Sequence, residues 1–138
     1  IYIIFILLLP FETPNWLLLI LAFLLGLSVD LFTNTVGMHS SATVFMAFIR
    51  PYILKVIAPR DGYETETLPQ LNYYGFGWFL RYASVLVIVH HSFLFYIEVF
   101  SFSNFFFTLL RVILSSIFSI FLIVISQYFF YSKDKRKR

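Results

Sequence analysis

Hydrophobic residues fill this chain in long runs that short polar stretches separate. Four of the runs are long enough for a membrane-spanning helix, which needs roughly 17–25 mostly apolar residues. They cover residues 16–33, 39–57, 75–97 and 104–131. A shorter apolar run at 1–9 stops at Pro10 and would reach only ~14 Å as a helix, too little to cross a bilayer. We expect a partial helix there, with an earlier helix missing from this sequence.

Polar residues gather in two further segments. Residues 58–74 hold acids, prolines and a glycine, which predicts a loop, and residues 132–138 form a basic tail. Pro51 lies inside the run at 39–57 and predicts a kink, because proline removes a helix hydrogen bond. The nearby Arg50 and Lys55 are expected to extend their side chains toward the nearer membrane surface. The prediction is one all-α transmembrane domain over 1–138, a polytopic helical bundle with about five hydrophobic segments.

Composition strengthens the membrane assignment. The chain is 60% hydrophobic and 12% charged, with a mean hydropathy of +0.87, whereas soluble domains carry about 25% charged residues. There is no cysteine, so disulfides and thiolate chemistry are excluded. The net charge of +3 comes largely from the tail, and we expect no nucleic-acid binding. By the positive-inside rule the C-terminus is cytoplasmic, as is the loop at 58–74.

One carboxylate lies inside the apolar pattern. Asp30 follows Ala22 and Gly26 at intervals of four residues, so the three share a helix face, and Gly37 begins a short break before the next run. An ionisable group at membrane depth costs roughly 2.5–3.5 kcal/mol on insertion scales and usually faces protein or water. Small residues on that face allow another helix backbone to approach closely. We therefore expect a packed interior face that carries one charge.

The last apolar run has its own polar face. Residues of this stripe recur at helical spacing, namely Asn104, Thr108, Arg111, Ser115 and Ser119. Arg111 lies at a depth similar to that of Asp30, so one hypothesis is an ion pair between them inside the bundle. The alternative is that Arg111 extends outward and Asp30 caps a turn with Thr33 or Asn34. The sequence leaves both open.

Other polar residues offer little chemistry. His90 and His91 are adjacent, so on a helix they point in different directions and cannot bind one metal together. His39 adds no third ligand, and we expect neither a metal nor any other cofactor. The tail is expected to bind anionic lipid headgroups; its basic residues are Lys133, Lys135, Arg136, Lys137 and Arg138.

Gly26, Asp30 and Gly37 also carry a family resemblance. A glycine, an aspartate four residues later and a second glycine seven beyond it resemble the signature of the rod shape-determining protein MreD family. The resemblance implies a non-enzymatic component of the bacterial inner membrane that acts in the elongasome, binds MreC and helps to direct peptidoglycan synthesis and cell shape. Indirect partners would be the actin-like MreB and the cell-wall glycosyltransferase and transpeptidase. The implied fold is similar to the substrate-binding subunits of vitamin transporters.

Two other functions remain open. The chain could itself be the substrate-binding membrane subunit of a small-molecule, vitamin-type transporter, which would need a polar pocket at the outer helix ends. A membrane enzyme would need several acids or histidines at one membrane level. Only Asp30, Glu98 and the histidines qualify, so the enzyme ranks last.

Overall fold

The computed structural model describes residues 2–100 and 104–135, and within them it contains helices and no strands. The six helices differ greatly in length. Their bounds are α1 Ile4–Leu7, α2 Asn15–Thr33, α3 Met38–Val56, α4 Leu71–Tyr74, α5 Phe76–Val99 and α6 Phe105–Lys135. The expected loop at 58–74 thus contains the short α4, and Glu98 belongs to α5. Helix α3 continues through Pro51 without a break.

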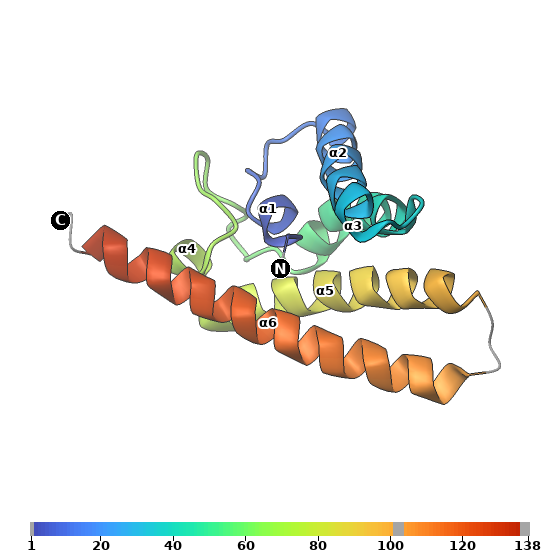
Figure 1. The fold of residues 1–138 in the computed structure, drawn as a ribbon. Helices are drawn as coiled ribbons and strands as arrows, with labels where there is room; N and C mark the ends of the chain where they lie inside the picture. The colour runs from blue at the N-terminus through green and yellow to red at the C-terminus, as the bar shows by residue number, and fades with distance from the viewer. Residues whose placement is uncertain (1, 101–103, 136–138) are drawn as a thin grey trace.

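The long helices form two antiparallel pairs. A tight turn connects α2 to α3, and the two helices pack against each other. Helices α5 and α6 run side by side as a second pair (Figure 1). Helix α3 also packs against α5 and so joins the pairs. The short α1 lies between the two pairs, where Ile6 and Leu7 are fully buried.

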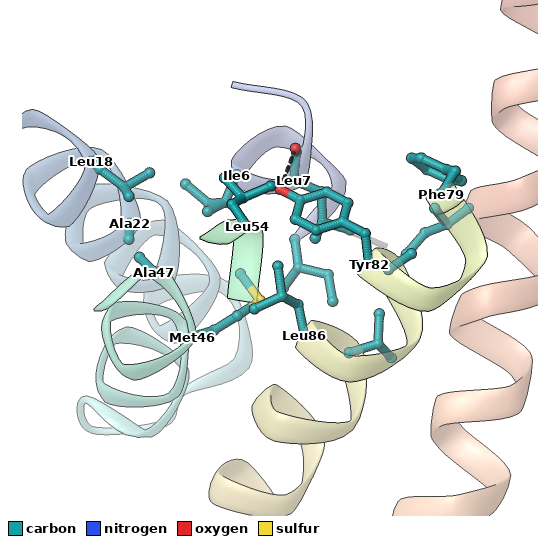
Figure 2. Packing of buried hydrophobic residues seen from close by; sticks show 14 of the residues in the cluster. Ile6, Leu7, Leu18, Ala22, Met46, Ala47, Leu54, Phe79, Tyr82 and Leu86 are labelled. Atoms are coloured by element: carbon teal, nitrogen blue, oxygen red, sulfur yellow. Dashed lines mark hydrogen bonds between the residues drawn. The ribbon is translucent and has the colours of Figure 1, made fainter. Parts of the chain in front are cut away.

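The core lies where α1, α2, α3 and α5 meet. Figure 2 shows Ala22 and Ala47 facing each other between α2 and α3, while Met46 and Leu86 fill the space between α3 and α5. The Tyr82 hydroxyl donates a hydrogen bond of 2.7 Å to the Leu7 carbonyl, which ties α5 to the end of α1. Small side chains at the α2–α3 contact bring two backbones close, as in other membrane helix pairs.

Within the described part of the chain, three helices are long and apolar enough to cross a membrane: Asn15–Thr33, Phe76–Val99 and Phe105–Tyr131. The count of about five hydrophobic segments stays a prediction. Helix α3 has the same length as α2 but is less apolar, because its buried positions include Ser40, Thr43 and Arg50. It packs against helices on two sides, so fewer of its side chains need to be lipophilic.

Helix α6 presents the most apolar surface to the surroundings. Phe106, Phe107, Phe118 and Phe129 are all more than half exposed. Soluble proteins rarely leave such a continuous apolar face uncovered. Together with the three candidate spans, this surface supports a helical membrane protein.

Candidate functional site

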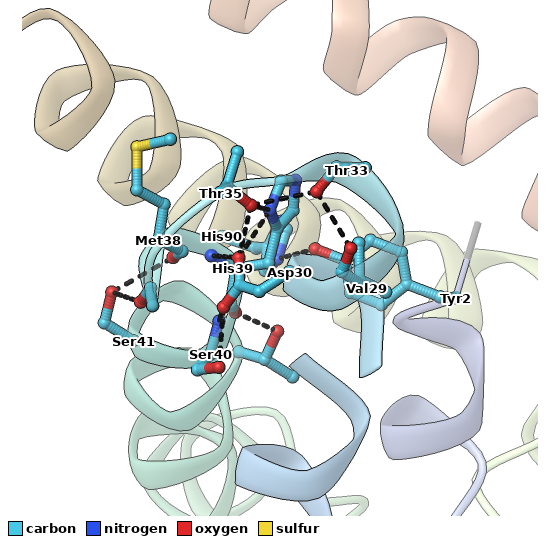
Figure 3. Close-up of polar contacts among 12 residues, drawn as sticks. Tyr2, Val29, Asp30, Thr33, Thr35, Met38, His39, Ser40, Ser41 and His90 are labelled. Atoms are coloured by element: carbon cyan, nitrogen blue, oxygen red, sulfur yellow. Dashed lines mark hydrogen bonds and ion pairs between the residues drawn. The ribbon is translucent and has the colours of Figure 1, made fainter. Parts of the chain in front are cut away.

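Asp30 is a buried carboxylate with contacts to three residues in the described part of the chain. It lies in the last turn of α2, and only 2% of its surface is exposed. Ala22 and Gly26 are buried on the same face of the helix, as their spacing predicts. Figure 3 shows the carboxylate pointing at the beginning of α3 rather than into the rest of the bundle. The site is therefore the α2–α3 turn itself.

The Asp30 carboxylate caps the N-terminus of α3. Oδ1 accepts a hydrogen bond of 2.9 Å from the His39 amide, and Oδ2 accepts one of 3.0 Å from the Ser40 amide. These amides belong to the second and third residues of α3, where a side-chain cap normally binds. The position before α3 is Gly37, which has no side chain to offer and adopts a φ of 74°. Asp30 supplies the cap from the preceding helix instead.

Gly26 makes this capping distance possible. A Cβ atom built on Gly26 would lie 2.4 Å from the Ser40 Cα and 2.7 Å from the His39 carbonyl oxygen. Both are backbone atoms of α3, so they cannot move aside as a side chain would. The first turn of α3 therefore rests directly on the backbone of α2, one helical turn below Asp30.

Three side chains complete the shell around the carboxylate. The Thr35 hydroxyl donates to Oδ1 at 2.6 Å, and the Ser40 hydroxyl donates to Oδ2 at 2.7 Å. His39 Nδ1 lies 3.0 Å from Oδ1 and can donate when it carries the proton. Sequence reasoning missed these partners, although the signal was present as hydroxyl and imidazole groups on both sides of Gly37.

The structure does not bring Asp30 and Arg111 together, so the ion-pair hypothesis was wrong. Arg111 instead lies 3.3 Å from Glu98 and 4.6 Å from the centre of the Phe95 ring. The reason is the packing order: α6 packs against α5, whereas α2 packs against α3. Arg111 is 52% exposed, in agreement with the alternative in which it extends outward. Asp30 does act as a cap, with partners other than Thr33 and Asn34.

The polar stripe on α6 faces α5 only in part. Thr108 and Ser119 are buried, Ser115 is half-buried, and Asn104 and Arg111 are exposed. The positions that α6 buries are Thr108, Val112, Ser116, Ser119, Ile123 and Gln127. The Ser119 hydroxyl lies 3.0 Å from His91 Nε2, so the stripe contributes a polar contact between α5 and α6.

Tyr2 contacts two of the histidines, His39 and His90. The Tyr2 hydroxyl lies 2.8 Å from His90 Nε2, and its ring also contacts the ring of His39 edge-on, with centroids 6.1 Å apart. Among residues 2–100 and 104–135, no three His, Cys, Asp or Glu residues lie close enough to hold a metal ion. Tyr2 thus links the Asp30 turn to the middle of the bundle (Figure 3).

Arg50 is a second buried charged residue. The sequence predicts that it reaches for the membrane surface, but only 1% of it is exposed. Its Nε donates to the Tyr82 hydroxyl at 2.8 Å, and Nη2 donates to the carbonyl of Leu9. One acceptor follows α1 in the chain and the other lies on α5, a combination that the sequence alone could not show. Lys55, one turn further on, is exposed as expected.

The predicted lipid-binding tail lies mostly outside the described residues. Lys133 is exposed at the end of α6. The side chains of Lys135, Arg136, Lys137 and Arg138 are not described, so their role stays a prediction.

Comparison of the chain with protein-family models, with curated proteins and with solved structures gave no match.

Proposed function

We propose that this protein is a non-enzymatic scaffold of the MreD type in the bacterial inner membrane. In this role it binds MreC and helps the elongation machinery to direct peptidoglycan synthesis and cell shape. The observation that carries the proposal is that Gly26, Asp30 and Gly37 form one structural unit. The three residues that carry the resemblance to MreD jointly build the α2–α3 turn.

The state of Asp30 favours a structural role over a chemical one. An ionised carboxylate has about four lone-pair sites, and four donors from Thr35, His39 and Ser40 surround this one, with His39 Nδ1 as a fifth when it carries the proton. A general base or a substrate-binding carboxylate needs a free acceptor that faces the substrate. Asp30 has none to spare, so its contribution is to hold two helices in one geometry for a partner.

The proposed orientation follows from charge. A cytoplasmic C-terminus, which the basic tail favours by the positive-inside rule, puts the Asp30 turn near the outer membrane surface when α3 crosses the membrane together with α5 and α6. MreC is the direct partner in this proposal, and MreB, the glycosyltransferase and the transpeptidase are reached indirectly. The α-helical arrangement would then be similar to that of vitamin-transporter substrate subunits. A reporter fused after Arg138 that is active only in the periplasm would refute this orientation.

Co-purification with MreC tests the function. The full chain and MreC from one genome are expressed together, extracted in mild detergent and captured through a tag on MreC. We expect the wild-type chain and Gly77→Ala to be retained, because a Cβ on Gly77 meets no atom within 4 Å. Gly26→Leu should be lost from the complex, because it separates α2 from α3. Failure of the stably folded wild-type chain to bind MreC would overturn the proposal.

A further inference from the structure

The charge of Arg50 has no acidic partner. Its two hydrogen bonds, to Leu9 and Tyr82, use two of the five guanidinium N–H donors. No carboxylate in the described part of the chain lies within ion-pair distance of it. Buried cations are normally paired with an anion, because desolvation of an unpaired charge is costly. A buried guanidinium with free N–H donors and no acidic partner can bind an anion from outside the chain.

A cavity of about 210 Å³ lies beside Arg50. Lys55, Asn15 and Thr13 add a second cation and two polar groups to its wall. No acidic residue lines it. The nearby glutamates line a separate cavity that shares only Phe11 and Tyr63 with this one. The Arg50 cavity therefore favours a negatively charged occupant.

The cavity adjoins an apolar groove on the outside of α2 and α3. This groove has a volume of about 170 Å³ and shares Asn15, Leu18, Pro51 and Lys55 with the Arg50 cavity. Its remaining wall is apolar or aromatic: Leu19, Ala47, Phe48 and Tyr52. Phe48 and Tyr52 are both more than half exposed. A polar cavity thus continues into an apolar surface that runs along two helices.

The position of the cavity matches the membrane interface. Asn15 is the first residue of α2, one of the three candidate spans, so the cavity lies at the end of a span. The neighbouring Trp16 is 65% exposed, and tryptophan is enriched at the level of lipid headgroups. The first amides of α2 have no side-chain cap at Pro14 and add positive partial charge at the same place.

We propose that this cavity binds the phosphate of an anionic phospholipid between Arg50 and Lys55, with an acyl chain along the groove by Phe48 and Tyr52. Arg50 supplies N–H donors from within the bundle, and Lys55 closes the outer side. This site is distinct from the basic tail, which begins in the last turn of α6. It depends on the chain being in a membrane and not on any role in cell shape.

Lipid titration of the purified full chain tests the site. Phosphatidylglycerol and phosphatidylcholine are added separately in detergent, and the melting temperature and bound lipid are measured by circular dichroism and native mass spectrometry. Phosphatidylglycerol should bind saturably and raise the melting temperature more than phosphatidylcholine does. Lys55→Gln should weaken phosphatidylglycerol binding about fivefold, the effect of one cation near a lipid surface. Tyr52→Ala should also weaken it by removing a groove wall.

The matched control is Arg81→Gln. Arg81 is an exposed cation near the start of α5, it bonds the Gly77 carbonyl of its own helix, and it lines neither cavity. It should leave binding unchanged. Equal weakening by Lys55→Gln and Arg81→Gln would reduce the effect to general charge attraction and overturn the site. Equal stabilisation by inorganic phosphate alone would overturn the lipid assignment, because no acyl chain would then be needed.

Discussion

Replacing Gly26 by alanine adds one methyl group where α2 and α3 touch. That carbon would lie 2.4 Å from the Ser40 Cα, whereas unstrained carbon atoms approach to ~3.5–4.0 Å. The two backbones must therefore separate by about 1 Å, because no rotation of a side chain can relieve the contact. The Asp30 hydrogen bonds to the His39 and Ser40 amides, at 2.9 and 3.0 Å, would stretch beyond useful length.

The expected loss can be estimated from these changes. Overpacking of a tight contact costs ~1–3 kcal/mol, and loss of a helix cap costs ~0.5–2 kcal/mol. Alanine recovers ~0.5–1 kcal/mol over glycine in a helix interior. The net expectation for Gly26→Ala is a loss of ~1–4 kcal/mol in the free energy of unfolding.

Reversible unfolding in mixed detergent micelles, followed by far-ultraviolet circular dichroism, measures this loss. Gly77→Ala is the matched control, since its new methyl group meets no atom within 4 Å. It should leave stability unchanged or raise it by up to ~1 kcal/mol. If Gly26→Ala is as stable as Gly77→Ala, then the α2 and α3 backbones do not touch at Gly26 and the capping geometry derived from that contact is wrong.

Three further changes test other parts of the structure. Asp30→Ala leaves the buried Ser40 amide and the half-buried His39 amide without acceptors and should destabilise the chain by ~1–3 kcal/mol in the same unfolding assay. Gly37→Ala should cost ~1–2 kcal/mol, because φ is 74° there, and Gly37→Asn should cost less; equal losses would contradict backbone strain as the cause. Arg111→Met breaks an exposed pair with Glu98 and should change stability by less than ~1 kcal/mol in a thermal melt.

The helices were predictable from the sequence because long apolar runs leave few alternatives in a membrane. The interior face of α2 was predictable for a similar reason: Ala22, Gly26 and Asp30 depart from an otherwise bulky apolar run at helical spacing. The partners of Asp30 were not, because a side chain at a helix end meets residues whose positions depend on how the following turn closes. Local spacing cannot supply that geometry.

The α6 stripe illustrates a different limit. In a soluble helix, polar residues mark the outer face, but in α6 the exposed side is mostly apolar and several buried positions are polar. Ser116 and Gln127 are buried against the bundle, whereas Arg111, on the predicted stripe, is exposed. A long arginine side chain can extend to the membrane surface from the edge of a buried helix face. The position of Arg111 therefore does not indicate which face of α6 is buried.

The spacing of the Gly26–Asp30–Gly37 unit follows from this geometry. An interval of four residues places Gly26 one turn below Asp30 on one helix face, so the contact with α3 and the cap on α3 occur together. The interval of seven then consists of the last three residues of α2, the turn at 34–36 and the glycine itself. With Gly37 at positive φ, the amides of His39 and Ser40 face Asp30. A carboxylate that accepts hydrogen bonds from four donors at the positive end of α3 needs no buried cation to balance it, which explains how Asp30 remains stable without Arg111.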